Sequence, residues 1–343
     1  MHLFGQSVYV VFHNGKHGGA PEGEPFVLSR GIFEEILSRM RAVGKEAIRV
    51  RTFNEEYLKL ILDDLAAEAG AEVLFHAVLC GVEKEGEQLR SVSFATKAGM
   101  LSFAADFFID ATGDADLAVM SGCPWRLGRT EDSLCQPMTL CFRLGGIDTQ
   151  AFFDHLPEIQ QVYREWQAAG KTENPRENVL SFHTLNRGGY SFQHNACGST
   201  ESAVQIGVRE SRMIDGEHLL TGEELKACTR FPDAIAAGNY DIDIHNPEGS
   251  GTSHYYFPQG AYYTIPYRSL QPKGAENLLV AGRCISCTHE AQASCRIMPI
   301  VTCLGEAAGT AAAIAHSTRR SLKKIDITEL QNTLRKNRAF LGE

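Results

Sequence analysis

Residues 107–116 read FFIDATGDAD and residues 277–286 read NLLVAGRCIS. Each stretch is an apolar run that stops at a glycine turn, which is typical of a buried strand in a parallel sheet. Open α/β sheets bind ligands where such strands end. Either stretch alone is weak evidence, because a strand–glycine turn often serves only close packing. The pair predicts an α/β fold whose sheet is built from distant parts of the chain.

The residues before the first stretch fit this fold. Residues 31–43 have apolar side chains at helical spacing, and Asn54 is placed to cap a second helix that closes at Gly70. Residues 71–106 predict three short antiparallel strands with turns at 84–87 and 97–99. The second helix is expected to bury one stripe of side chains: Leu58, Ile61, Leu62 and Leu65.

The middle of the chain differs in character, with short strands, polar loops and helical pieces. We interpret residues 135–265 as a mixed α+β substrate or cap domain. It is inserted between a first part of the main domain, residues 1–134, and a C-terminal part, residues 266–343. Near the end, the small residues of 304–316 (LGEAAGTAAAIAH) predict a helix against which a large ligand can lie closely.

The order of these motifs is more specific than any one of them. ATGD, a long insertion, AGR, then S.R.MP and LGEAAGTAAA together resemble the FAD-dependent oxidoreductase family. Similar members are the flavoprotein subunits of fumarate reductases and heterodisulfide reductases. The resemblance covers nearly the whole chain and is most specific in the C-terminal block. It implies a Rossmann-like FAD-binding domain with an inserted domain.

The resemblance also implies FAD as cofactor and gives candidate contacts. The two glycine turns would lie along the dinucleotide, and a helix starting around Gly305 would point its amides at the flavin's carbonyl edge, stabilising reduced flavin. The implied cofactor-binding residues are Thr112, Gly113, Asp114, Gly282, Arg283, Met298, Pro299, Gly305, Glu306 and Ala307.

The N-terminal region departs from the family pattern. The family opens with a strand, a G-x-G-x-x-G loop and a helix, but Gly15, Gly18 and Gly19 do not form that motif. We expect a truncated or mis-assigned start, rather than a natural remnant or a subunit completed by another chain. The alternative to an active enzyme is therefore a truncated, non-catalytic chain that does not hold FAD stably on its own. Such a chain is expected to be poorly soluble or to self-associate.

Four residues are candidates for catalysis: Arg296, His289, Arg268 and His254. An arginine beside a flavin can clamp a carboxylate or donate a proton, and a histidine can act as general acid or base. For Arg296 and His289 the alternative is that they only hold loops by hydrogen bonds to backbone carbonyls. The expected reaction is hydride transfer between FAD and a small polar or anionic substrate, with an electron-transfer partner that the sequence does not name.

Two further patterns favour structural roles. Asp241, Asp243 and His245 alternate along a strand and could bind a cation, but such runs are more often solvated, so we predict no metal. Arg209, Glu210 and Arg212 are expected to form a structural ion-pair network. Cys284 and Cys287 have the spacing of a redox dithiol. Small buried thiols packed around a cofactor are the favoured interpretation.

The composition narrows the class of protein. The net charge of −9 and the absence of a basic block argue against nucleic acid or an anionic membrane as a partner. No run approaches the roughly 20 apolar residues of a transmembrane helix, and no secretory signal is visible. Ten cysteines are too dilute for a disulfide scaffold. We therefore expect a cytoplasmic protein.

Overall fold

The computed structural model describes residues 28–49, 52–139, 141–145, 148–174, 178–183, 189–193, 201–202, 206–258 and 260–342. The first elements are α1 (Ile32–Val43), β1 (Ile48–Arg49), β2 (Thr52–Phe53), α2 (Glu55–Glu68), β3 (Val78–Glu85), β4 (Gln88–Thr96), β5 (Gly99–Ala104), β6 (Phe108–Asp110), α3 (Asp116–Met120) and β7 (Trp125–Leu127). The middle elements are β8 (Cys141–Gly145), α4 (Thr149–Asp154), α5 (Leu156–Ala168), β9 (Leu180–His183), β10 (Gly189–Gln193), β11 (Glu201–Ser202), β12 (Arg212–Ile214), α6 (Gly222–Lys226), β13 (Ala234–Gly238), β14 (Ile242–His245), β15 (Thr252–Tyr255) and β16 (Tyr263–Pro266). The last elements are η2 (Tyr267–Leu270), β17 (Leu278–Val280), α7 (His289–Cys295), α8 (Met298–Thr318), η3 (Leu322–Lys324) and α9 (Ile327–Lys336).

The two strand–glycine stretches, residues 107–116 and 277–286, contain one parallel pair of strands, as predicted. Strand β17 pairs with β6 in parallel, with Leu279 opposite Ile109 and Val280 opposite Asp110. All three residues of β17 are buried, which explains their continuous apolar character. Both strands therefore end at one edge, where the ATGD and AGR turns lie close together.

Helix α8 packs in the main hydrophobic core. Its alanines and larger residues such as Leu304 and Ile314 share one buried cluster with Leu279 of β17 and Tyr263 of β16. Among the described helices, only α8 is long and apolar enough to cross a membrane by length and composition. However, 56% of its apolar window is buried inside the protein. The core helix of a folded domain passes the same test.

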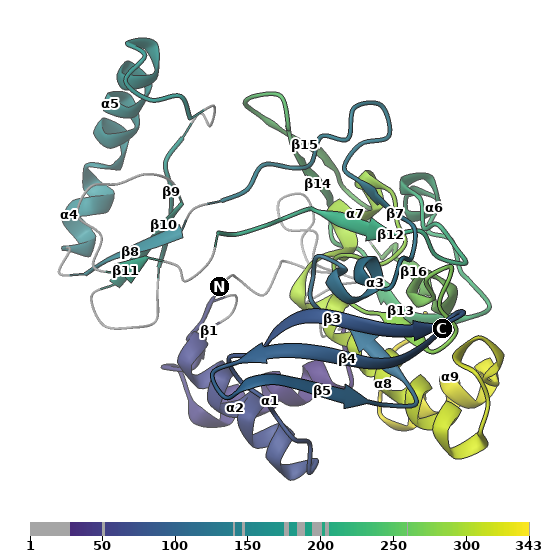
Figure 1. Cartoon of the computed structure of the whole chain (residues 1–343). Coiled ribbons are helices and arrows are strands. Elements are labelled where there is room, and N and C mark those ends of the chain that lie inside the picture. Colours follow the sequence, from purple (N-terminus) through teal and green to yellow (C-terminus); the bar gives the residue numbers. More distant parts are fainter. Residues whose placement is uncertain are drawn as a thin grey trace.

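The N-terminal elements largely follow the predictions. Asn54 caps α2 by accepting a hydrogen bond from the amide of Glu56, and Gly44 ends α1. Strands β3, β4 and β5 form the expected antiparallel meander (Figure 1). The predicted stripe of α2 is only partly correct. Ile61 is buried, whereas Leu62 is 46% exposed because α2 packs on α1 along a narrower face.

The middle of the chain packs in two separate regions. Strands β8–β11 form a four-stranded sheet, and Figure 1 shows it with α4 and α5 in a lobe set apart from the rest. Residues from 206 onward instead enter the main core, where Met213, Leu220 and Phe257 pack with Leu279 and Leu304. The hydrophobic core is therefore continuous across residue 265, and the domain bounds at 135 and 265 stay predictions. The cause is that β13 and β16 pair across that region and lie against α8.

Candidate active site

An ion pair joins the two glycine turns. The Arg283 guanidinium donates to Oδ1 of Asp114 at 2.6 Å, although the two residues are far apart in sequence. Ser211 also donates to Asp114, at 2.5 Å. Burial opposes ionisation of Asp114, but the hydrogen bonds from Ser211 and Arg283 hold the pKa of this carboxyl below its ordinary value. A fixed negative and positive charge thus lie at the edge where the parallel strands end.

The backbone of the first turn is held by Asp110. Its buried carboxylate accepts hydrogen bonds from the amide and hydroxyl of Thr112 and from the amide of Ala118. The Thr112 hydroxyl in turn accepts from the amide of Asp116. Asp110 and Thr112 therefore shape the turn from inside.

Glycine is required at residue 113 by its surroundings. Gly113 has a φ of 84°, and a Cβ there would lie 2.7 Å from Nη1 of Arg283. The arginine therefore crosses directly over the turn backbone. Gly282, in the second turn, also has a positive φ, 137°.

Helix α8 presents its N-terminus directly after these residues. It begins at Met298, with Pro299 in its first turn, and the preceding Ile297 provides no side-chain cap. The amides of the first turn are thus not capped by Ile297, and the positive end of a long helix dipole lies there. The predicted helix start near Gly305 is wrong, because Pro299 is tolerated at a helix start and the apolar spacing runs back to Met298.

The residues expected at the helix start therefore lie inside α8. Gly305 is exposed with open space around it, whereas Ala307 is fully buried in the core. Glu306 is buried and accepts the amide of Ile32 at 3.0 Å, so it caps the start of α1 from a neighbouring helix. Burial raises the pKa of Glu306. Cofactor contacts of these three residues stay predictions.

A buried histidine–glutamate pair lies at the start of α7. His289 Nδ1 is 2.8 Å from Oε1 of Glu210, and the two side chains are 4% and 0% exposed. The other carboxylate oxygen accepts the backbone amide of Gln136 at 2.7 Å. Nε2 of His289 has no hydrogen-bond partner within the described chain.

Arg296 lies at the other end of α7. Its guanidinium contacts Oε1 of Gln136 and the carbonyl of Asp243, each at 3.5 Å, and approaches the Asp243 carboxylate at 4.0 Å. Burial lowers the pKa of Arg296, while the charge of Asp243 opposes this. Its Nε has no partner among the described residues. Gln136 thus bridges the His289 and Arg296 ends of the helix.

Asp243 collects several polar side chains. The Tyr240 hydroxyl donates to it at 3.3 Å, and Nε2 of His245 and of His254 each lie 3.7 Å from its carboxylate. Burial first, and then the charge of Asp243, raise the pKa of Tyr240. The structure therefore brings His254 and Arg296 together around Asp243. Within the described residues, no group of three or more His, Cys, Asp or Glu side chains could hold a metal ion.

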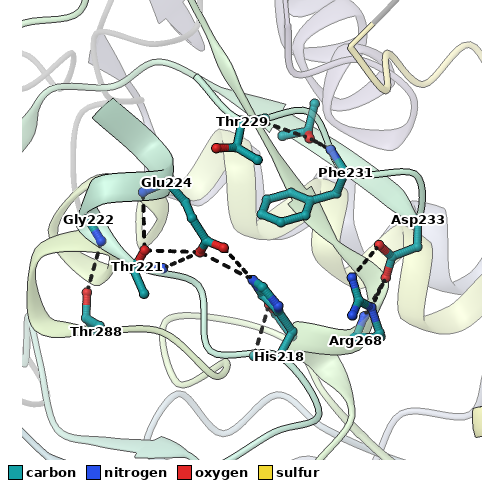
Figure 2. Close-up of polar contacts among 11 residues, drawn as sticks. His218, Thr221, Gly222, Glu224, Thr229, Phe231, Asp233, Arg268 and Thr288 are labelled. Carbon is teal, nitrogen blue, oxygen red and sulfur yellow. Dashed lines mark hydrogen bonds and ion pairs between the residues drawn. The ribbon is translucent and has the colours of Figure 1, made fainter. Parts of the chain in front are cut away.

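Arg268 lies in a different polar network. Its guanidinium contacts Asp233 at 2.9 Å and 3.2 Å, beside the His218–Glu224 pair (Figure 2). Glu224 belongs to a capping box with Thr221 at the start of α6. Arg268 is thus held in a structural ion pair, and none of its contacts in the described chain reaches Asp243 or His289.

The cysteines do not form the pair suggested by their spacing. Burial raises the pKa of Cys284 to about 12. The Cys287 thiol instead donates to Sδ of Met213 at 3.8 Å, and the neighbouring Cys295 and burial raise the pKa of Cys287. Both thiols of the C-x-x-C motif are fully buried and free. High thiol pKa values and burial favour the packing interpretation.

Sequence reasoning missed two residues of the site. Glu210 is bonded to His289 and Gln136, while Arg209 contacts Pro137 and Thr139, and Arg212 contacts Asp114 and Asp116. The described contacts of Arg209, Glu210 and Arg212 therefore lead to three different parts of the chain. Gln136 opens the stretch QPMTLCFRL (136–144), which also resembles the family, and this was its only signal.

A comparison with protein-family models identifies the family. The model for FAD dependent oxidoreductases matches residues 6–197 and 176–334. The chain belongs to this family. Its cofactor is accordingly FAD, and the mixed α/β architecture with a parallel pair agrees with an α/β flavoprotein fold.

Three solved structures show a weak similarity to this FAD-dependent oxidoreductase. They are the anhydrotetracycline hydroxylase OxyS from Streptomyces rimosus (13% identity, TM-score 0.38), AlpK (12%, 0.38) and BexE (13%, 0.34), the last studied for oxidation during BE-7585A biosynthesis. They match over 85%, 95% and 77% of this chain, but the chain covers only 54%, 64% and 43% of theirs. A search of curated proteins finds no match.

Two features of the described residues suit an anionic cofactor. Nε of Arg283 is buried and lacks a partner within the described residues, so this cation has hydrogen-bonding capacity left beside the glycine turns. The N-terminus of α8 supplies a positive dipole end for a partly anionic ring. Arg283 would therefore hold phosphate, and α8 would lie at the flavin.

Proposed function

We propose that this chain acts as an FAD-dependent oxidoreductase of the fumarate-reductase-like kind, working in the cytoplasm. Its reaction would be hydride transfer between FAD and a small polar substrate. The observation that carries this proposal is the buried polar cluster between α7 and β14, called the cluster on α7 below, which lies directly before the N-terminus of α8. The cluster contains unpaired atoms of His289, Arg296 and Asp243.

Unpaired buried polar atoms are costly. Each such atom destabilises a fold by about 1–3 kcal/mol, and more when the group is charged. Buried polar groups are therefore nearly always paired, and exceptions often mark functional sites. The two unpaired atoms at opposite ends of α7, Nε2 of His289 and Nε of Arg296, are linked through Gln136, and we propose that a polar substrate satisfies them.

The residues then have distinct roles. FAD, when bound, would accept or donate the hydride. Arg296 orients a polar group of the substrate through its free Nε, and His289 holds or accepts a proton at Nε2. His254 lies at the more exposed side of Asp243, with a side chain 36% exposed.

The first experiment is the visible absorption spectrum of the full chain before and after incubation with FAD, followed by desalting. A flavin spectrum that survives desalting supports the proposal. A panel of small polar compounds is then screened anaerobically for bleaching of the bound flavin. A colourless protein that cannot be reconstituted would contradict the proposal and favour the non-catalytic alternative.

Matched variants locate the site. Arg296→Lys should slow flavin bleaching by about 10²-fold or more, because lysine cannot reproduce the fork of donors. Arg268→Lys is the control, since Arg268 lies in the separate network with Asp233. Equal losses in both variants would show that the effect is structural rather than local to the cluster.

A further inference from the structure

We propose that Glu210 positions His289 as a proton acceptor, and that the site therefore oxidises a substrate carrying an O–H or N–H bond next to the carbon that loses hydride. This inference rests on the proposed function, which leaves the direction of electron flow open. It names the direction and the substrate class: alcohols or amines.

The geometry around Glu210 determines which nitrogen carries the proton. Oε2 of Glu210 already accepts the amide of Gln136 at 2.7 Å, and Oε1 faces Nδ1 of His289 at 2.8 Å. A carboxylate with both oxygens engaged in this way is an acceptor only. The hydrogen between Glu210 and His289 therefore belongs to Nδ1.

The consequence falls on the opposite ring nitrogen. With Nδ1 protonated, a neutral imidazole has its lone pair on Nε2. Nε2 is buried and has no hydrogen-bond partner in the described part of the chain. The Glu210 carboxylate therefore selects the Nδ1–H tautomer of His289, as carboxylates do in other carboxylate–histidine pairs.

Gln136 is oriented by the same network. Its Nε2 donates to Oε1 of Gln292 at 3.2 Å, and Gln292 is fixed because its own amide donates to the carbonyl of Arg209 at 2.7 Å. Oε1 of Gln136 must therefore face Arg296 and the amide of His245. One hydrogen-bond network thus holds both the acceptor at His289 and the donor at Arg296.

The unpaired atoms describe the substrate. Nε2 of His289 is a buried acceptor and Nε of Arg296 a buried donor, each without a hydrogen-bond partner within the described residues, and Oδ1 of Asp243 has only the His254 ring at 3.7 Å. Two carboxylates, Glu210 and Asp243, already lie beside the buried cation Arg296. A ligand with O–H or N–H donors and one acceptor satisfies this set better than a further carboxylate does.

The reaction balances for such a substrate. The carbon–hydrogen bond breaks and its electron pair leaves with the hydrogen as hydride, which FAD takes up. The O–H or N–H bond breaks and its proton passes to Nε2 of His289, while the C=O or C=N bond forms. The substrate loses two electrons and FAD gains two.

A second histidine–glutamate pair serves as the matched control. His218 lies 3.2 Å from Glu224 through Nε2, with side chains 19% and 27% exposed, and Glu224 is already engaged by Thr221 (Figure 2). Here the carboxylate faces the other ring nitrogen and caps a helix. Glu224→Gln therefore alters a histidine pair without touching the cluster on α7.

The direct test is nitrogen NMR of the full chain with ¹⁵N-labelled histidine rings, at about pH 8, above the ordinary pKa of histidine. His289→Gln assigns the signals. We expect the Nδ1–H tautomer for His289 in the wild type, a shift towards Nε2–H in Glu210→Gln, and no change at His289 in Glu224→Gln. An Nε2–H or doubly protonated ring in the wild type would overturn the inference.

This measurement needs neither cofactor nor turnover, so it separates the inference from the proposed function. If Glu210→Gln does not fold, the wild-type spectrum still decides, and Glu210→Asp provides a second comparison. An unchanged His289 tautomer in a folded Glu210→Gln variant also contradicts the inference.

The substrate class is tested on the FAD-loaded chain with panels of secondary alcohols, primary amines and unsaturated carboxylates. We expect alcohols or amines to bleach the flavin. Glu210→Gln should reduce the rate of bleaching by about 10²–10⁴-fold, and Glu210→Asp should recover part of it. The proposed substrate class would be refuted if neither alcohols nor amines bleached the flavin. It would also be refuted if the unsaturated carboxylates alone reacted, by reoxidising reduced flavin.

Discussion

Replacement of Gly113 by alanine perturbs the contact between the two glycine turns. The new Cβ would lie 2.7 Å from Nη1 and 2.9 Å from Cζ of Arg283, closer than such atoms approach one another. The φ of 84° adds a backbone cost of about 1–2 kcal/mol for any residue with a side chain. Arg283 must move, which weakens its 2.6 Å bond to Asp114.

The magnitude follows from these two effects. A hydrogen bond between charged groups contributes about 1.5–3 kcal/mol when buried. The side chains of Arg283 and Asp114 are 25% and 30% exposed, so we reduce this to about 1 kcal/mol. Gly113→Ala should therefore lower the free energy of unfolding by about 2–3 kcal/mol.

Gly122→Ala is the matched control. Gly122 has a similar φ of 74°, but no atom lies within 4 Å of the point that a Cβ would occupy there. It should show the backbone cost alone, about 1–2 kcal/mol. The two variants differ by the Arg283 contact, about 1 kcal/mol, or about 0.3 M in the urea midpoint.

The assay is urea unfolding of the apo chain together with FAD titration by flavin fluorescence. If Arg283 holds phosphate, Gly113→Ala should also weaken FAD binding by about fivefold relative to Gly122→Ala, since about 1 kcal/mol corresponds to that ratio. Identical urea midpoints and identical FAD affinities for the two variants would refute the role assigned to the Arg283 contact.

Three other predictions concern stability and reactivity. The pKa of Asp114 is lower in the folded protein than in the unfolded chain. Its contribution to stability is therefore present above the unfolded pKa of about 3.9 and is lost as the pH falls through the folded pKa. In Asp114→Asn, the urea midpoint should depend less on pH between about pH 3 and 6 than it does in the wild type. Asn277→Ala should destabilise the fold by about 2–4 kcal/mol, because Asn277 satisfies the amide and carbonyl of Leu89 and the carbonyl of Asp106; a loss below about 1 kcal/mol in calorimetry would contradict this. Alkylation followed by peptide mapping should label exposed Cys80 well before Cys284 and Cys287 in the native protein, and rapid labelling of the latter two would revive the redox pair.

Sequence patterns predicted local features correctly where neighbouring residues in the chain cause those features. The cap at Asn54, the stop at Gly44 and the turns of the β3–β5 meander depend on neighbouring residues, and each appears as predicted. The start of α8 was misplaced because small residues around Gly305 mark a packing face, whereas the helix begins where Pro299 is tolerated. Leu62 was wrongly expected to be buried, since periodicity does not reveal how wide a contact face is.

The structure places the candidate catalytic residues in two separate polar networks, which sequence patterns did not reveal. Sequence proximity suggested Arg268 beside the site, but its position is set by Asp233, a partner distant in the chain. Glu210 and Gln136 carried no motif of their own, and their roles follow only from where the fold places them beside His289 and Arg296. Hydrogen bonds of this kind join residues that no spacing rule connects.

The sequence by itself determined the family, the FAD cofactor and the two strand–glycine turns, because these depend on contiguous motifs with strict backbone requirements at Gly113 and Gly282. Tertiary structure decided which charged groups meet: Asp114 with Arg283, Glu210 with His289, and Asp243 with Arg296. Each pair joins segments separated by a long stretch of chain. Burial then determines their electrostatics, since a charge removed from water must be satisfied by whatever the fold brings to it.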